Sequence, residues 1–154
     1  MSELNRREFV LAAGAAVCAA CVAGCASDGG GGAAQPWTGP TTFELPPPTE
    51  IKEGIDTRWV TVGGFFLVRE RDRIYAVTST CSHRACPVAA KGTEYVCPCH
   101  GSRFTPAGRV LVGPATTPLT RFGTSVNAAG RLVVDRLKVF PQGQWDQSGA
   151  FVAV

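Results

Sequence analysis

Two Cys–His pairs lie close together in the middle of the 154-residue chain. One residue separates Cys81 from His83, and two residues separate Cys97 from His100. Each pair is too short to enclose a metal alone, so we expect two loops that close on one site from opposite sides. Thiolates and imidazoles are ligands that suit zinc or an iron–sulfur cluster. Both histidines of the chain fall in these pairs, which leaves neither for general acid–base catalysis.

Two further cysteines lie within the same two segments. Cys86 follows His83 by three residues, and Cys99 lies between Cys97 and His100. If all four cysteines bound the metal, the two histidines would be superfluous. If Cys86 instead bonds Cys99, a disulfide would tie the two loops together. The residues by themselves leave both arrangements open.

The segments C-S-H-R-A-C (81–86) and C-P-C-H-G-S (97–102) resemble the two ligand motifs of disulfide-containing Rieske iron–sulfur proteins. In a Rieske [2Fe–2S] cluster, two histidines replace two cysteines on one iron. The segment Gly113-Pro114-Ala115 resembles the family's proline loop, which covers the cluster. The resemblance extends over roughly residues 43–154.

This resemblance implies a role for each cysteine and histidine of the two motifs. The implied cluster ligands are Cys81, His83, Cys97 and His100, and the implied disulfide joins Cys86 to Cys99. A structural zinc site is the alternative, because zinc also binds two cysteines with two histidines. Classical zinc fingers, however, carry one Cys pair and one His pair, whereas each pair here mixes the two. The extra cysteines and the proline loop favour the [2Fe–2S] cluster.

Two residues are expected to tune the cluster, one at the end of the second motif and one just after it. Ser102 stands where high-potential Rieske proteins donate a hydroxyl to a bridging sulfide, although a hydroxyl that caps a turn is the simpler alternative. Phe104 stands where many of these proteins have a tyrosine that donates to a ligating cysteine. Phenylalanine cannot donate, so we expect a high potential that is still below that of a relative with both groups.

A second departure from the family lies at the tip of the first motif. Arg84 follows His83, where quinol-oxidising members usually have an apolar residue that docks on cytochrome b. An arginine could instead steer an acidic redox partner or simply point into water. Ala85 replaces the family's usual glycine.

The elements that must position these loops are predicted to be strands. Apolar, β-branched runs at 65–68 and 74–78 flank a charged turn, which indicates a hairpin leading directly to the first motif. Further strands are predicted at 59–62, 94–96, 110–112, 119–126 and 131–135. No stretch of ten residues beyond position 24 shows helical periodicity. The chain is predicted to be all-β, and the resemblance implies three layers of antiparallel sheet with a small cluster-binding subdomain.

The N-terminal residues have a different composition and resemble a bacterial export signal. Residues 1–24 contain paired arginines before an uncharged, alanine-rich run, as in a twin-arginine signal peptide. The run ends in V-A-G-C, which resembles a lipoprotein processing site and predicts lipidation of Cys25. Residues 25–42 are rich in glycine and proline and are expected to form a flexible tether. The domain is then expected to span residues 43–154.

These features predict a lipid-anchored one-electron carrier on the extracytoplasmic face of a bacterial membrane, in the periplasm or its equivalent. The alternative is the Rieske subunit of a quinol–cytochrome c type or molybdenum-dependent complex, and a zinc-stabilised binding module is the third candidate. The expected donor is a membrane quinol, cytochrome b or a molybdoenzyme, and the expected acceptor is a c-type cytochrome. The formal net charge of +3 is too small to predict nucleic-acid binding. The sequence offers no second histidine–carboxylate iron site, which argues against an oxygenase.

Overall fold

The computed structural model describes residues 37–154. The predicted signal peptide, Cys25 and most of the predicted tether lie outside the described residues. Within residues 37–154, none of the helices has the length and apolar character that crossing a bilayer requires.

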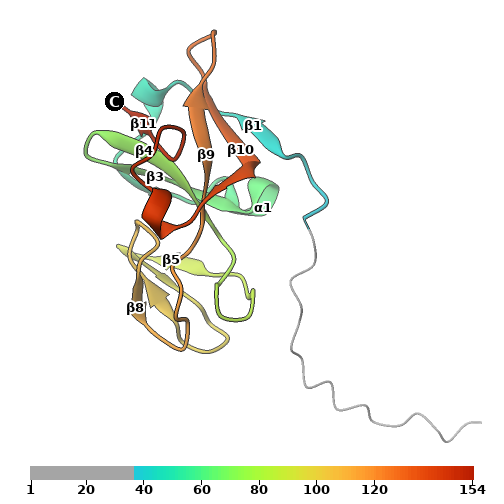
Figure 1. Cartoon of the computed structure of the whole chain (residues 1–154), viewed down its shortest axis with the longest axis vertical. Helices are drawn as coiled ribbons and strands as arrows, with labels where there is room; N and C mark the ends of the chain where they lie inside the picture. The colour runs from blue at the N-terminus through green and yellow to red at the C-terminus, as the bar shows by residue number, and fades with distance from the viewer. Residues whose placement is uncertain (1–36) are drawn as a thin grey trace, which may run out of the picture. The chain divides into compact units, whose positions relative to one another are not determined.

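The described chain forms two antiparallel sheets and almost no helix, which confirms the all-β prediction (Figure 1). The larger sheet has the order β1-β10-β9-β4-β3-β2, with β11 paired to β4. Its strands are β1 (Thr42–Glu44), β2 (Gly54–Asp56), β3 (Phe65–Glu70), β4 (Arg73–Thr78), β9 (Arg121–Val126), β10 (Leu132–Phe140) and β11 (Val152–Ala153). The smaller sheet has the order β5-β6-β7-β8. Its strands are β5 (Ala89–Lys91), β6 (Glu94–Val96), β7 (Arg103–Phe104) and β8 (Val110–Val112).

The β3–β4 hairpin is buried on both faces. Structure packed on each of these faces gives the predicted three layers, although the strands belong to only two sheets. One face, which includes Phe65 and Ile74, packs with Leu132 and Val134 of β10. The opposite face, which includes Phe66 and Tyr75, packs with residues of the smaller sheet. On that side the rings of Phe66 and Tyr95 stack with their centroids 4.4 Å apart. Near-continuous apolar runs, rather than alternating ones, are what a strand with two buried faces requires.

One predicted strand is wrong. Residues 59–62 contribute instead to a short helix, α1 (Val60–Gly63), which ends at Gly64 in the left-handed conformation with φ 67°. The N–H of Gly64 donates to the carbonyl of Val60, as expected at a helix C-terminus. Trp59 also stacks on Phe65, with the ring centroids 6.4 Å apart. Glycine capping and aromatic packing therefore outweigh the β-propensity of this segment.

The remaining strand predictions are located correctly but differ in length. The predicted hairpin is present, with Glu70 paired to Arg73 across its turn. The last predicted strand, 131–135, continues as β10 to Phe140 through a register shift between Asp135 and Val139. Five strands of two or three residues were not predicted, namely β1, β2, β5, β7 and β11. Short 3-10 turns occur at η1 (Pro48–Glu50) and η2 (Gln142–Gln144).

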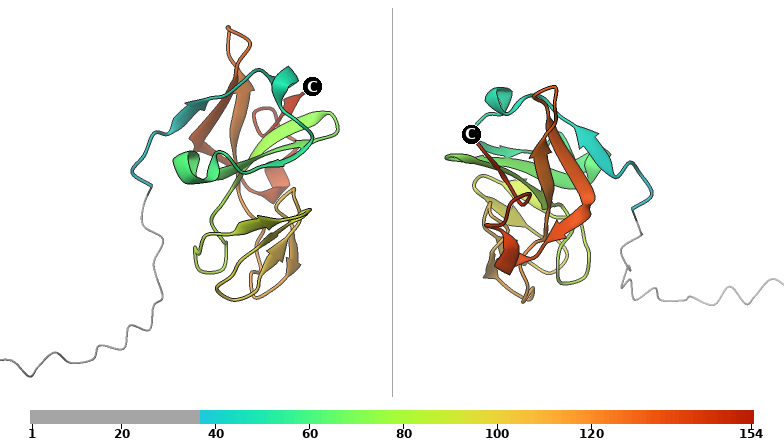
Figure 2. Two further views of the ribbon diagram at one scale, coloured as in Figure 1. Left: turned by 180° about the vertical axis from the view of Figure 1, so that it is seen from behind. Right: turned by 45° about the horizontal axis from the view of Figure 1, so that its top comes forward.

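The smaller sheet and its loops form one insertion between β4 and β9, which we define as residues 79–120 and call the insertion. Strands β4 and β9 pair directly, with Ala76 opposite Phe122. Immediately beyond this pairing, the N–H of Thr78 donates to the carbonyl of Thr120 at 3.0 Å. The insertion therefore leaves and re-enters the larger sheet at neighbouring positions (Figure 2). We call the remaining described residues, 37–78 and 121–154, the base.

Candidate metal centre

The first Cys–His loop closes on itself directly after β4. The N–H of Cys81 donates to the carbonyl of Cys86, and the N–H of Ala85 donates to the carbonyl of Cys81, both at 2.8 Å. To close this turn, Ala85 adopts the left-handed conformation with φ 54°. The turn buries Cys81 and leaves His83 half-buried, so the two predicted ligands extend from one compact loop.

The second loop follows β6 and closes in a similar way. The N–H of Cys97 donates to the carbonyl of Ser102 at 2.8 Å, and the N–H of Gly101 donates to the carbonyl of Cys97 at 3.0 Å. Gly101 has φ 76°, a conformation that glycine adopts readily. Cys97 is buried, whereas His100 is exposed to solvent.

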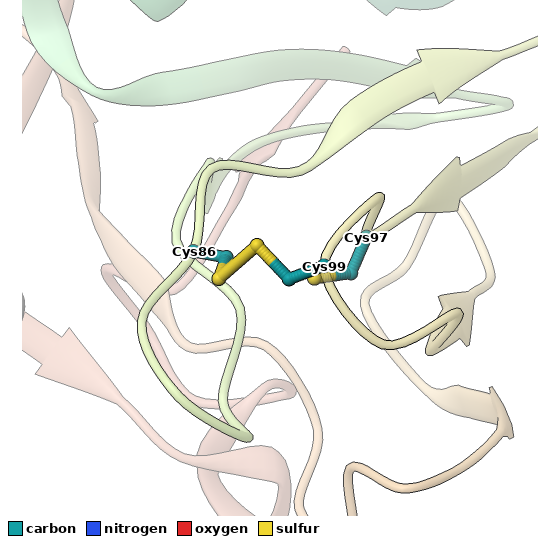
Figure 3. Close-up of side chains that lie close together, drawn as sticks. All are labelled: Cys86, Cys97 and Cys99. Atoms are coloured by element: carbon teal, nitrogen blue, oxygen red, sulfur yellow. A yellow bond between two sulfur atoms is a disulfide. The ribbon is translucent and has the colours of Figure 1, made fainter. Parts of the chain in front are cut away.

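The two loops face one another and are joined by a disulfide between Cys86 and Cys99, with the Cα atoms 6.5 Å apart (Figure 3). The Sγ atom of Cys97 lies within 4.8 Å of both disulfide sulfurs. Two of the three sulfurs in this group are bonded to each other, so the group is not a second metal site. The rings of His83 and His100 lie with centroids 4.9 Å apart, at an interplanar angle of 87°. All four predicted ligands therefore belong to two loops that the disulfide holds together.

The free thiols of Cys81 and Cys97 are buried beside one another. Burial raises the pKa of the Cys81 thiol, and the neighbouring Cys97 raises it further. The backbone N–H groups of His83 and Arg84 act in the opposite direction but do not cancel the rise. A metal cation would reverse this preference, because a coordinating thiol is deprotonated outright.

His83 supplies a test of whether a metal fits between the loops. Its Nδ1 atom is buried and has no hydrogen-bond partner among the described residues. A buried polar atom without a partner costs about 1–3 kcal/mol, so native structures rarely leave one unsatisfied. A metal bound between the loops would satisfy this nitrogen. The two loops offer two thiols and two imidazoles, and the unpartnered nitrogen belongs to one of these imidazoles. This donor set suits a Rieske cluster.

The predicted covering loop is attached to both ligand loops. Gly113 and Pro114 are joined by a cis peptide bond, and the next residue, Ala115, is buried. The N–H of Ala115 donates to the Oγ atom of Ser102 at 3.0 Å. The Oγ atom of Ser82 donates to the carbonyl of Thr117 at 2.5 Å. Ser82 was not among the predicted site residues, although its position between Cys81 and His83 was an available signal.

Ser102 links two loops rather than capping a turn of its own. Its side chain is fully buried, and its oxygen accepts the hydrogen bond from Ala115. A hydroxyl that accepts one hydrogen bond keeps its own proton free to donate. Ser102 can therefore hold the covering loop and donate a hydrogen bond at the same time.

The other two predicted tuning residues differ in their exposure. Phe104 is fully buried and packs in the same core cluster as Cys81 and Cys97. Arg84 is exposed, and it forms no ion pair with any carboxylate within residues 37–154.

Comparison with known proteins places this site in a family. Residues 42–140 match the family model described as the Rieske [2Fe-2S] domain. A Rieske 2Fe-2S iron–sulfur protein of Bacillus subtilis is 43% identical over 65 residues, which cover 39% of this chain and 13% of that protein. The cytochrome b6-f complex iron–sulfur subunit of Arabidopsis thaliana chloroplasts is 34% identical over 73 residues, covering 44% of this chain and 32% of that subunit. The chain thus spans about a third or less of these relatives.

Two solved structures are also similar. The plasma membrane Rieske protein PetC3 of the cyanobacterium Synechocystis PCC 6803 has 25% sequence identity and a TM-score of 0.40, over 60% of this chain and 98% of that chain. A complex of reduced oxygenase and oxidised ferredoxin in carbazole 1,9a-dioxygenase has 25% identity and a TM-score of 0.43, over 62% of this chain and 94% of that chain.

Proposed function

The chain belongs to the Rieske [2Fe-2S] family, and on this premise we propose that it is a one-electron carrier anchored at a membrane surface. The family's cofactor is a [2Fe–2S] cluster, which supplies reversible one-electron chemistry when bound. We assign its ligands to Cys81, His83, Cys97 and His100.

The observation that carries this assignment is the facing arrangement of the two loops. The loops supply two buried thiols and two imidazole rings 4.9 Å apart, and a disulfide fixes the loops to one another. The Nδ1 atom of His83 is buried, and residues 37–154 offer it no hydrogen-bond partner. Two neutral imidazoles in place of two thiolates raise the reduction potential of such a centre. We propose that Ser102 stabilises added negative charge through its free hydroxyl proton.

The membrane location rests on the N-terminal sequence. We propose that residues 1–24 are a twin-arginine signal, that Cys25 is lipidated and that residues 25–42 tether the domain. The disulfide supports an extracytoplasmic site, because such bonds persist outside the reducing cytosol. Two or more acyl chains would hold the domain stably at a membrane without a spanning helix. Replacing Cys25 with alanine should release the protein from the membrane fraction, whereas replacing the nearby Cys21 should not.

A second candidate function is that of a subunit in a larger oxidoreductase, of the quinol–cytochrome c type or the molybdenum-dependent type. The similarity to cytochrome b6-f iron–sulfur subunits favours the first of these. In that setting the donor would be a membrane quinol or cytochrome b, or else a molybdoenzyme, and the acceptor a c-type cytochrome. Purification from the native membrane with cytochrome b or a molybdopterin subunit would establish this candidate. Purification without either would favour the independent carrier.

The direct test is electron paramagnetic resonance of the dithionite-reduced, exported protein. We expect the rhombic spectrum of a Rieske centre, with iron and acid-labile sulfide in equal amounts. The spectrum should be lost in Cys81→Ser and kept in Ser79→Ala, a neighbouring buried position without a predicted ligand role. A colourless protein with stoichiometric zinc, prepared from cells supplied with iron, would overturn the proposal and favour the zinc-stabilised module.

A further inference from the structure

Charge is distributed unequally between the insertion and the base. The insertion carries four basic residues, Arg84, Lys91, Arg103 and Arg109, but only one acidic residue, Glu94. The base carries nine basic and eight acidic residues and is therefore close to neutral. Most of the chain's excess positive charge within residues 37–154 thus lies on the part that contains the candidate metal centre.

The acidic residue of the insertion is already paired. A carboxylate oxygen of Glu94 lies 2.5 Å from a guanidinium nitrogen of Arg103. Among residues 37–154, this ion pair is the only one that involves the insertion, whereas the other five join residues of the base. Arg109 lies 5.4 Å from the ring centroid of Trp145, on the side toward the base. Arg84 and Lys91, in contrast, form no ion pair with any carboxylate within residues 37–154.

Arg84 is the charge that belongs to the site itself. The three loops around the candidate centre, 79–88, 97–102 and 113–118, contain no acidic residue and no basic residue other than Arg84. Arg84 is exposed and directly follows His83. The exposed residues of the other two loops, such as Pro98, His100 and Pro114, carry no fixed charge. The rim of the site thus presents one fixed cation on an otherwise uncharged, exposed surface.

We propose that this rim is a docking surface for an acidic redox protein, whose carboxylates surround its own redox centre and pair with Arg84. This inference rests on the proposed function, because it concerns the partner with which the site exchanges electrons. A guanidinium donates to both oxygens of a carboxylate in a fixed geometry, so Arg84 can pair specifically with a carboxylate of the partner. The wider positive field of the insertion would steer an acidic partner toward this end of the molecule. The uncharged surface around Arg84 would allow close approach after the encounter.

The surface charge can be measured without knowing the natural partner. The reduced protein would be mixed in a stopped-flow instrument with anionic hexacyanoferrate(III) and, separately, with the cationic tris(phenanthroline)cobalt(III). Arg84→Gln removes the charge at the rim. Arg71→Gln is the matched control, because Arg71 is also exposed and forms no ion pair within residues 37–154, but lies in the β3–β4 turn of the base. The same bound cluster is present in every variant, so its own charge cancels in the comparison.

Arg84→Gln should slow oxidation by the anion and accelerate oxidation by the cation, each by roughly three- to tenfold at low ionic strength. Both differences should disappear at high salt, because the Debye length then falls to about 3 Å at 1 M. Arg71→Gln should change neither rate by more than a small factor. With protein oxidants, an acidic soluble cytochrome c should react faster than a basic one, and Arg84→Gln should remove most of that advantage.

Two results would overturn the inference. One is equal behaviour of Arg84→Gln and Arg71→Gln with every oxidant. The other is binding of the wild-type domain, but not Arg84→Gln, to vesicles containing anionic lipid, together with no preference for the acidic cytochrome. That result would assign the rim to a membrane instead. The visible and electron paramagnetic resonance spectra are recorded first, so absence of the cluster counts against the proposed function rather than against this surface.

Discussion

The insertion and the base are stabilised by different kinds of interaction. The base contains the strands of six or more residues, and its β3–β4 hairpin is buried on both faces. Strands of the insertion have only two or three residues. In their place, one disulfide and two hydroxyl hydrogen bonds join its three loops. A unit this small buries little apolar surface and depends on covalent or metal cross-links for stability.

Electrostatics separates the same two regions. Within residues 37–154, five of the six ion pairs lie in the base, which leaves its surface nearly neutral. The insertion keeps most of its positive charge unpaired. The base thus provides a stable support, while the insertion carries the chemistry and the surface where a partner would bind. Removal of a cross-link within the insertion should therefore affect the insertion more than the base.

Loss of the metal should have the largest effect. In Cys81→Ser, we expect complete loss of the cluster, because one of the two proposed thiolate ligands is removed. Metal-binding energy also contributes directly to local folding. Hydrogen–deuterium exchange should show loss of protection in β5–β8 and retained protection in β3, β4, β9 and β10. Equal loss of protection in both sheets would show that the base is not independently stable.

Removal of the disulfide should have the next largest effect. The double variant Cys86→Ala/Cys99→Ala removes a bond between residues 13 apart in sequence, which should lower the stability of the insertion by about 3 kcal/mol. We expect faster release of the cluster in denaturant and little change in the unfolding midpoint reported by fluorescence of Trp59 and Trp145 in the base. Unchanged cluster release would mean that the bond does not restrain the ligand loops.

Ser102→Ala should destabilise the covering loop more than Ser82→Ala. The first change leaves the N–H of Ala115 without its partner in a buried position, at a cost of about 1–3 kcal/mol. The second change frees the carbonyl of Thr117 at an exposed position, where water can replace the hydroxyl. Ser102→Ala should also lower the reduction potential. The two variants can be compared by thermal release of the cluster and by redox titration. Similar results for both would contradict the expectation that loss of the buried hydrogen bond costs more than loss of the exposed one.

Phe104→Tyr should raise the reduction potential with little effect on the fold. Its new hydroxyl would lie in the core cluster that contains Cys97, where it can donate to a ligating sulfur. If that hydrogen bond is about 1 kcal/mol stronger in the reduced state, the potential should rise by roughly 40 mV. The control, Phe65→Tyr, adds the same atom to the core of the base and should leave the potential unchanged. A rise in both variants would exclude a direct hydrogen bond as the cause.

Ala85→Gly should have the smallest effect and the opposite sign. Ala85 has φ 54°, a left-handed conformation that costs a residue with a Cβ atom about 1–2 kcal/mol. Glycine removes this cost but adds about 0.5–1 kcal/mol of chain entropy to the unfolded state, so the net gain should be below about 1 kcal/mol. Ala90→Gly, in β5, should be destabilising instead. Thermal melting of the two proteins provides the comparison.

The features that could be predicted from the sequence are those with strong local signals. The facing loops follow from the spacing of Cys81, His83, Cys97 and His100, because each pair needs the other to enclose a metal. The hairpin before Cys81 follows from two apolar runs on either side of a charged turn. The three layers were implied by the family resemblance, and the two buried faces of this hairpin explain them in physical terms.

The features that could not be predicted depend on contacts that are distant in sequence. Strands of two or three residues, such as β7, are too short to show periodicity and form because a partner strand is already in place. Helix α1 has strand-forming residues but is set by Gly64 and by the stacking of Trp59 on Phe65. The hydrogen bond between Ser102 and Ala115 joins residues 13 apart. Motif spacing alone does not specify that contact.

The hydrogen bond between Thr78 and Thr120 has a consequence for how such proteins can diversify. Because the insertion begins and ends at adjacent backbone positions, its entropic cost to the base is that of closing a single loop. The entropic cost of loop closure grows only slowly with length, so residues can be added or exchanged within the insertion at little cost to the base. A complete redox module could therefore be transplanted as one continuous segment of chain between scaffolds whose hairpin offers the same apolar face for it to pack on.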